Sequence, residues 1–457
     1  MGYTTSEIVE LIKASGASAL DPTLLAESSE SNIASAIYDL DANHCRSVLR
    51  LLDNSSAAAV MSEMPNDLAA DILSQMREIR ALDVIEEFDP DDAADIVFEL
   101  DEGNKSRLFG KLDGEIAESI EHLLTFGPDT AGGIMTPEFA GMTGDMTVDQ
   151  AIAKIRILNE KLETFYYIYI LDANQCLHGV VSMRQLVLAN QDQRIDQIMV
   201  RDLLGVCQVD MDKEEVARQM GLHNLLALPV VGDRNELLGI VTHDDILDVI
   251  QDEATEDLQK LLGAGGDEQL SDSVSYAFKK RAPWLLVNLF TSCFAAAVIY
   301  HYQAVISQFT LLAVFLPVVA NIAGNTGSQT LAVSIRSVST EAILNGPERL
   351  FSICFKESIK GLISGLPVSI VASLLGIGLA IYANFTFDYS FRLGIALLLS
   401  MQLSMALSSF TGVFVPMMLR RLGLDPAQSA SIFLTAFTDI AGFFLFLRLG
   451  IFLLYQR

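Results

Sequence analysis

The sequence is poor in the residues that carry most enzyme chemistry. It holds 5 cysteines and no CxxC pair, a pattern that favours neither a disulfide framework nor a zinc site. We expect these thiols to be packing residues in a reducing compartment. The 6 histidines are scattered, and the sequence shows neither a P-loop nor a nucleophile paired with a histidine. An enzyme is therefore the class we least expect.

Basic residues are scarce in the first part of the chain, and acidic residues are scarce in the second. The whole chain has 58 acidic residues (Asp and Glu) and 30 basic residues (Lys and Arg). Residues 281–457 hold 6 of the acidic and 10 of the basic residues, so residues 1–280 hold 52 acidic and 20 basic residues. The first part therefore argues against nucleic-acid binding and suits cations or basic partners. This composition predicts an acidic soluble region followed by an apolar membrane region.

The N-terminal region, residues 1–131, is predicted to be an acidic helical domain. Its start, MGYTTSEIVELIK, lacks the basic and apolar regions of a signal peptide, so we expect none. The stretches NDLAADILSQM (66–76) and PDDAADIVFEL (90–100) share one rhythm of acidic, small and apolar residues. Their apolar spacing is helical, which indicates a solenoid of short helices with solvated acidic faces.

Residues 132–258 contain an internal repeat. IYILDANQCLHGVVSMRQL (168–186) aligns with LPVVGDRNELLGIVTHDDI (228–246) at an offset of 60 residues without a gap. Each copy predicts a strand, a polar turn, a second strand and a helix. The repeat resembles a tandem pair of CBS modules. Such pairs often bind adenosine nucleotides through a Ser or Thr and an Asp three positions on, which implies ATP binding at Thr242 and Asp245 but not at the first copy, where Gln185 replaces the Asp.

The stretch HDDILDVIQDEATEDLQKLLG (243–263) predicts a linker helix that leads into an acidic connecting segment at 259–281. Its carboxylates crowd about four turns, and like charges at i,i+4 spacing repel. Either this is a solvated acidic helix, or bound cations offset the repulsion.

Residues 282–457 are predicted to form an all-α domain of five membrane-spanning helices, near 284–303, 309–334, 358–383, 391–418 and 427–454. Each is long enough to cross a hydrocarbon core of about 30 Å. Basic residues precede the first span and lie between the second and third and between the fourth and fifth. By the positive-inside rule the N-terminus is cytoplasmic, and five spans put the C-terminus outside.

Polar residues interrupt the apolar spans. Asp439 lies within the fifth, one turn after Thr435, and Asn321 and Asn325 have the same spacing in the second. A charge at bilayer depth costs about 3 kcal/mol or more, so it usually faces a cavity. Oxygen ligands without His or Cys suit hard cations such as Mg²⁺. A two-fold dimer would supply two copies of Asp439 to a divalent ion. The serines and threonines of the second and fourth spans are equally well explained as contacts between helices.

The motifs PVVANIAGNTGSQT, DEATEDLQKLLG and LTAFTDIAGFF, in this order with the CBS pair, resemble the MgtE family of magnesium channels and transporters. The resemblance covers nearly the whole chain. It implies a homodimer in the bacterial cytoplasmic membrane, a pore site at Asn325 and Asp439 supported near Asn321 and Thr435, and Asp425 at the cytoplasmic mouth.

The resemblance also implies a cytoplasmic gate that senses Mg²⁺. The sensor residues that it implies are Asp91, Asp92, Asp95, Asp212, Glu214, Asp245, Asp248, Glu253, Glu256 and Asp257. The chain departs from the family pattern at three places. Asn224 replaces an acid, SASIF (429–433) replaces a Gly-Pro, and the acid at the outer start of the second span is missing, with only Asp388 near the outside.

The overall prediction is a multidomain membrane protein with an α-helical solenoid, an α/β CBS pair and an all-α transmembrane domain, and its function is Mg²⁺ uptake. Two alternatives stay open. One is a membrane-anchored nucleotide or ion sensor without transport, and the other is an anion channel with CBS modules. The sequence does not separate Mg²⁺ from Co²⁺, Ni²⁺ or Mn²⁺.

Overall fold

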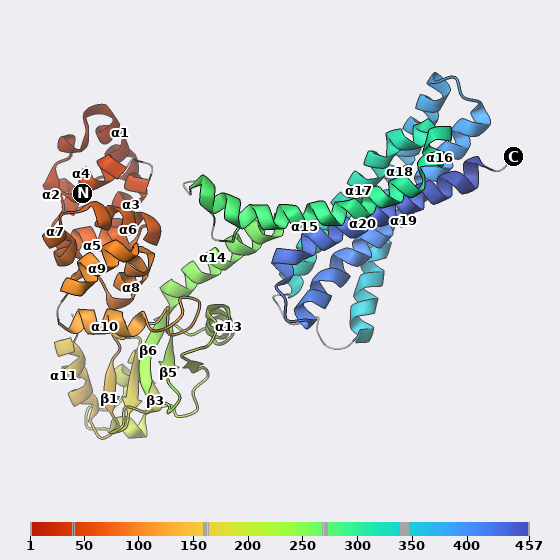
Figure 1. Cartoon of the computed structure of the whole chain (residues 1–457). Helices are drawn as coiled ribbons and strands as arrows, with labels where there is room; N and C mark the ends of the chain where they lie inside the picture. Colours follow the sequence, from red (N-terminus) through yellow and green to blue (C-terminus); the bar gives the residue numbers. More distant parts are fainter. Residues whose placement is uncertain are drawn as a thin grey trace. The chain divides into compact units, whose positions relative to one another are not determined.

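The computed structural model describes residues 2–38, 40, 42–112, 114–158, 162, 164–266, 268, 273–338 and 347–455. The chain divides into two compact units, Met1–Gln251 and Asp252–Arg457 (Figure 1). The division falls within one helix, α14 (His243–Leu261), which matches the predicted linker helix. Because α14 is continuous, its acidic residues belong to both units.

The first half of unit 1 consists of short helices, as the sequence predicts. They are α1 (Thr5–Ser15), α2 (Pro22–Ala26), α3 (Glu30–Tyr38), α4 (Ala42–Leu49), α5 (Asn54–Ser62), α6 (Asn66–Gln75), α7 (Glu78–Ile85), α8 (Pro90–Glu99), α9 (Glu102–Leu108) and α10 (Glu115–Leu123). The carboxylate of Asp53 accepts from the backbone N–H of Ser56 and so caps α5. Small and aliphatic residues at helical spacing form a continuous core.

The second half of unit 1 contains the two predicted α/β repeats. The first has β1 (Gly141–Thr143), α11 (Val148–Leu158), β2 (Tyr167–Leu171), β3 (Leu177–Ser182) and α12 (Met183–Leu188); the second has β4 (Cys207–Gln208), α13 (Lys213–His223), β5 (Ala227–Val231), β6 (Leu237–Thr242) and α14. Tyr167 pairs with Ser182, and Ala227 pairs with Thr242. The two antiparallel registers are therefore identical after a shift of 60 residues, which confirms the predicted repeat.

Each repeat has a glycine where another segment crosses its second strand. A Cβ on Gly239 would lie 2.6 Å from the carbonyl oxygen of Thr136, and a Cβ on Gly179 would lie 2.9 Å from that of Val200. At both crossings the backbone approaches closely enough to form a β-bridge. These glycines, which the alignment of the repeats matches, are needed for close approach of the backbone.

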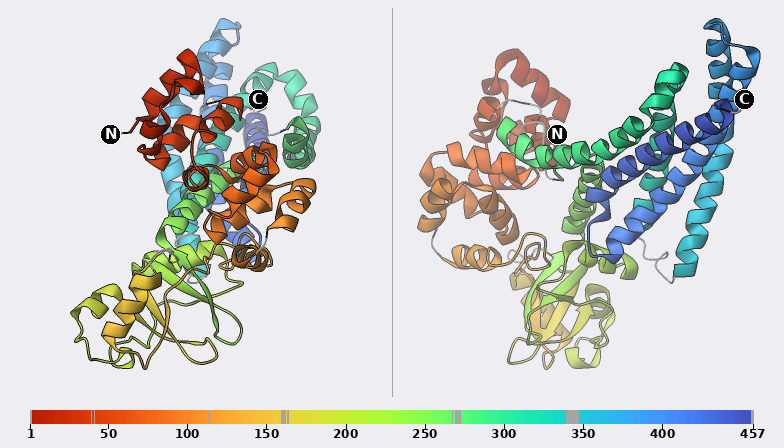
Figure 2. Two further views of the ribbon diagram at one scale, coloured as in Figure 1. Left: turned by 90° about the vertical axis from the view of Figure 1, so that its left-hand side faces the viewer. Right: turned by 45° about the vertical axis from the view of Figure 1, so that its right-hand side comes forward.

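Unit 2 contains α15 (Val274–His301), the short α16 (Gln303–Gln308), α17 (Thr310–Val338), α18 (Pro347–Tyr382), α19 (Phe387–Arg421) and α20 (Pro426–Leu454). Among the described residues, five helices are long and apolar enough to cross a membrane. Helix α19 packs against α17, α18 and α20, and the two views of Figure 2 show this group of helices running alongside one another. The first span begins earlier than its apolar segment because Ser273 caps the helix ahead of it.

Candidate functional site

The two asparagines of the second span lie on an exposed face of α17. Asn325 Nδ2 donates to Asn321 Oδ1 at 2.8 Å, the contact expected of amides one turn apart. Both side chains are exposed in the single chain and lie near the middle of the helix. The amide pair therefore points away from the packed interior of its own chain, at the depth where a bilayer would be most apolar.

The acid of the fifth span lies near the middle of α20. Asp439 is half-buried, and no hydrogen bond or ion pair joins its carboxylate to another described residue. One turn earlier, the exposed Thr435 donates its hydroxyl to the carbonyl oxygen of Ser431 at 2.8 Å. A Cβ on Gly324 of α17 would lie 3.9 Å from Thr438 Oγ1 of α20. The two helices thus meet beside both polar pairs.

One chain does not complete a metal site there. The described residues contain no group of three or more His, Cys, Asp or Glu that could hold a metal ion. Outward-facing amides and a carboxylate at bilayer depth need water or another protein surface, because hydrocarbon offers them no hydrogen bonds. The arrangement offers oxygen atoms that an ion could approach from outside the single chain.

Three hydroxyl-bearing residues of α17 are buried, unlike its two asparagines. Thr326, Thr330 and Ser334 each donate to a carbonyl oxygen of their own helix at 2.8–3.1 Å. On α19, the buried Ser408 donates to the carbonyl oxygen of Ala323 on α17, and Gln402 donates to Ser369 Oγ at 2.7 Å. Ser408 and Gln402 therefore join neighbouring helices, whereas the three hydroxyls of α17 are satisfied within their own helix and can pack against a neighbour. Of the two explanations that the sequence leaves open, the packing role fits these residues.

Glycines allow α17 and α19 to approach closely on that face. A Cβ on Gly327 would lie 2.5 Å from Ser408 Oγ, and a Cβ on Gly412 would lie 2.8 Å from the carbonyl oxygen of Gly327. The same addition at Gly324 meets nothing closer than Thr438 Oγ1. Close approach of the helices therefore requires a glycine at position 327 but not at position 324.

The C-terminal end of α14 is attached to the start of α20 within unit 2. Lys260 Nζ pairs with Glu256 one turn earlier and lies 3.3 Å from Asp425 Oδ2. Asp425 also caps α20 by accepting from the backbone N–H of Ala427 at 2.8 Å. Loss of solvent, with the Asp425 charge as a second cause, raises the pKa of the nearby Asp257. Three implied ion-binding carboxylates thus meet around one lysine, which the sequence reasoning missed.

A second group of carboxylates gathers within unit 1, between α8 and the start of α14. Loss of solvent, together with the nearby Asp92 and Asp245 charges, raises the pKa of Asp95 to about 7, although part of its side chain remains exposed. Burial is also the main cause that raises the pKa of Asp245 to about 6. Burial raises the pKa of Asp92, and Asp89 adds to the effect. This group repels itself at neutral pH.

The other implied sensor residues are Asp91, Asp212, Glu214, Asp248 and Glu253. Asp212 caps α13 by accepting from the backbone N–H of Glu214 at 2.9 Å. Asp91 is half-buried in the first turn of α8, Asp248 is exposed on α14, and Glu253 is half-buried a little further along that helix. Within unit 2, the Glu253 charge adds to the raised pKa of Asp257, so Glu253 belongs with the carboxylates at the C-terminal end of α14.

Two departures from the family pattern have local structural reasons. Asn224 ends α13 with a left-handed backbone, φ 51° and ψ 48°, a conformation that Asn adopts more readily than most residues. Asp388, at the start of α19, pairs with Arg392 one turn on, at 2.8 Å. The third departure, at 429–433, lies within the unbroken helix α20.

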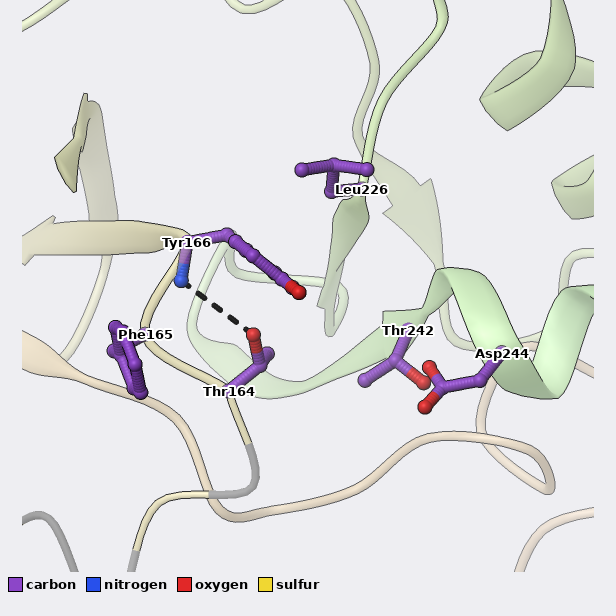
Figure 3. A pocket seen from close by; sticks show the side chains of 6 residues that line it. All are labelled: Thr164, Phe165, Tyr166, Leu226, Thr242 and Asp244. Atoms are coloured by element: carbon purple, nitrogen blue, oxygen red, sulfur yellow. Dashed lines mark hydrogen bonds between the residues drawn. The ribbon is translucent and has the colours of Figure 1, made fainter. Parts of the chain in front are cut away.

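The CBS pair contains a small cavity of about 170 Å³ (Figure 3). Thr242, Asp244 and Leu226 line it opposite Thr164, Phe165 and Tyr166. The Thr242 hydroxyl donates to the carboxylate of Asp245, and in the first repeat Ser182 makes the same contact with Gln185. Both pairs stand at the start of a helix, so the predicted nucleotide residues also have a helix-capping role. The acid that faces the cavity is Asp244 rather than Asp245.

Comparison with known proteins adds three family matches. Residues 316–449 match MgtE, described as a divalent cation transporter, residues 28–129 match the MgtE intracellular N domain, and residues 195–252 match the CBS domain. The magnesium transporter MgtE of Thermus thermophilus is 33% identical over 361 residues, covering 75% of this chain and 74% of that protein. The one from Enterococcus faecalis is 32% identical over 346 residues, covering 74% and 72%.

Solved structures give a similar result. The cytosolic domain of the Mg²⁺ channel MgtE in complex with ATP matches 54% of this chain and 99% of that chain, with 33% identity and a TM-score of 0.51. The soluble part of a magnesium transporter matches 55% of this chain and 98% of that chain, with 31% identity and a TM-score of 0.50.

Proposed function

Because this chain belongs to the MgtE family of divalent cation transporters, we propose that it carries Mg²⁺ across the bacterial cytoplasmic membrane through a path lined by α17 and α20. The single observation that supports this path most is the pair of exposed amides near the middle of α17, beside the half-buried carboxylate of Asp439 on α20. An anchor for a soluble sensor has no need of such a set.

The ion-binding groups in the path are Asn325 and Asp439, with Asn321 and Thr435 in support. Mg²⁺ dehydrates reluctantly and is typically held by one or two carboxylates and several retained waters. One Asp439 offsets half of its charge. A homodimer with the path on its axis supplies two copies of Asp439 and covers the polar faces that the single chain leaves exposed.

The cytoplasmic acids form the gate. At low Mg²⁺ the carboxylates around Asp92, Asp95 and Asp245 repel one another, as do those around Asp257 and Asp425 at the end of α14, and the gate loosens. At high Mg²⁺ bound ions bridge these carboxylates and hold it closed. The gate therefore has an open and a closed state, and the balance between them depends on bound Mg²⁺, which is allostery in the strict sense.

The CBS cavity is the proposed nucleotide site, with Phe165 and Tyr166 available to stack on a base opposite Thr242. Its volume of about 170 Å³ is below the roughly 300–1,000 Å³ of most small-molecule sites. Binding of ATP therefore requires these side chains to move apart. We also propose that the C-terminus lies outside the cell, because the basic residues near Arg336, Lys356 and Arg420 favour a cytoplasmic position for their loops.

Transport is tested by Mg²⁺ uptake into proteoliposomes that contain the full-length protein or its Asp439→Ala variant. We expect uptake in the wild type at low internal Mg²⁺ and a loss of at least about tenfold in the variant, because the carboxylate that would bind the divalent ion is removed. Equal uptake by the two proteins would contradict a role of Asp439 in the path. No uptake by either would favour the sensor without transport.

A further inference from the structure

The N-terminal domain contains one groove of the opposite charge. The groove has a volume of about 350 Å³ and is lined by Arg46, Arg50, Gln75, Met76, Arg77 and Arg80. Residues 1–131 hold 27 Asp and Glu but only 8 Lys and Arg. Half of these bases therefore meet at one place, and the described residues that line the groove include no Asp or Glu.

Two helices that are distant in the sequence bring the arginines together. Arg46 and Arg50 lie one turn apart at the end of α4, and Arg77 is the N-cap residue of α7, where no side chain caps the helix. Arg80 joins the two helices by donating from one terminal nitrogen to the carbonyl oxygens of Leu49 and Leu52, at 2.8 and 2.9 Å. The groove is thus held by the fold.

A structural role accounts for only part of this cluster. Arg80 closes the end of α4 through those carbonyl oxygens, as Arg107 does for α6 by donating to Ser74 at 2.8 Å. Neither Arg50 nor Arg77 has a carboxylate partner among the residues that the structure describes. Guanidinium groups are always charged and repel one another. An anion in the groove would relieve this repulsion.

The geometry favours a phosphate-bearing small molecule. Guanidinium groups bind phosphate through two parallel hydrogen bonds. Arg77, which lines the groove, is also the N-cap residue of α7, where no side chain accepts from the first backbone N–H groups. The volume lies at the lower end of the range of about 300–1,000 Å³ for small-molecule sites. We propose that this arginine groove binds a small polyphosphate, either inorganic or the phosphate tail of a nucleotide. The proposal does not depend on Mg²⁺ transport.

The test is calorimetric titration of full-length protein in detergent with inorganic triphosphate. The groove variant is Arg50→Gln with Arg77→Gln. The matched control is Lys13→Gln with Lys105→Gln, which removes the same charge from the same domain outside the groove. We expect the Kd for triphosphate to rise at least about tenfold in the groove variant and less than about twofold in the control. Absence of binding to the wild type, or equal weakening in both variants, would overturn the proposal.

Two further arms make the result specific. Arg50→Lys with Arg77→Lys keeps the charge but removes the paired hydrogen bonds, so we expect an intermediate Kd. ATP then distinguishes the two sources of phosphate. If ATP displaces triphosphate and the groove variant prevents this, the groove takes nucleotide tails. If ATP binds without displacing triphosphate, the groove takes the inorganic ion. Unchanged Mg²⁺ uptake by the groove variant would show that it is folded.

Discussion

The two faces of α17 carry polar side chains of different kinds. On one face Asn321 and Asn325 are exposed and contact only each other among the polar groups described. On the other, Thr326, Thr330 and Ser334 are buried and return their hydroxyls to carbonyl oxygens of their own helix. Hydroxyls that are satisfied within the helix can pack against α19, whereas amides that face outward remain available to an ion. A polar residue in a span is thus not by itself a sign of a path.

The largest expected effect comes from exchanging one residue on each face. Asn325→Leu removes an amide from the proposed path, and we expect Mg²⁺ uptake into proteoliposomes to fall at least about tenfold. Thr330→Val removes a hydroxyl of the buried face while keeping its shape, and we expect less than a twofold change. A larger loss in Thr330→Val than in Asn325→Leu would reverse the assignment of the faces.

Substitutions at Gly324 and Gly327 of α17 test how closely each side of this helix is packed. Gly327→Ala would place its Cβ 2.5 Å from Ser408 Oγ and 3.0 Å from Leu434, and overpacking of this kind costs about 1–3 kcal/mol. Gly324→Ala meets only Thr438 at 3.9 Å, and alanine favours helix by about 1 kcal/mol. We expect the thermal midpoint in detergent to fall for Gly327→Ala only. Equal midpoints would contradict close contact between α17 and α19.

A smaller effect is expected from a substitution in the proposed gate. Lys260→Ala removes the cation that lies between Glu256 and Asp425, and a partly exposed pair of this kind is worth about 0.5–1 kcal/mol. The carboxylates then depend more on Mg²⁺ to stay together. We expect the Mg²⁺ concentration that closes the transporter to rise roughly two- to fivefold. Lys279→Ala, on α15, is the control, and a fall in that concentration would contradict the account.

The smallest expected effect is on pH dependence in unit 1. The pKa values of Asp95, about 7, and Asp245, about 6, lie above the usual value of about 3.9. The folded protein therefore binds more protons than the unfolded chain, and stability rises as pH falls from about 7 towards about 4. Mg²⁺ competes with these protons, so its stabilising effect should be larger at about pH 7.5 than at about pH 5.5.

The check is the thermal midpoint with and without Mg²⁺ at both pH values. Asp95→Asn should reduce the difference, and Asp83→Asn, an exposed aspartate of α7, should not. A stabilising effect of Mg²⁺ that is larger at the lower pH would contradict the assignment of these carboxylates to ion binding.

Much of the fold was predictable because it rests on local or repeated patterns. The repeat at an offset of 60 residues has no gap, which implies that both copies pair their strands in the same register. The pairs Tyr167–Ser182 and Ala227–Thr242 have this register. Long apolar runs indicate five spans. Helix ends were less predictable, because a cap such as Ser273 extends α15 beyond its apolar segment. The part of a helix that lies in the membrane is therefore better predicted from its apolar segment than from the ends of the whole helix.

What the sequence could not predict depends on tertiary contacts. The hydroxyls of α17 look the same as its amides until α19 covers one side of the helix. Lys260 meets Asp425 across 165 positions of the chain, and Arg50 meets Arg77 only through the packing of α4 and α7. A search for basic residues in an otherwise acidic domain is the one sequence signal that would have marked the groove.

The most direct test of the central claim is the access of water and ions to the two faces of α17. Asn325→Cys and Thr330→Cys would each be introduced into a cysteine-free protein and treated with a positively charged thiol reagent during Mg²⁺ uptake. We expect the reagent to modify Asn325→Cys and block uptake, with Mg²⁺ slowing the reaction, and to leave Thr330→Cys unmodified. Block through Thr330→Cys, with Asn325→Cys unreactive, would show that the ion passes along the other face.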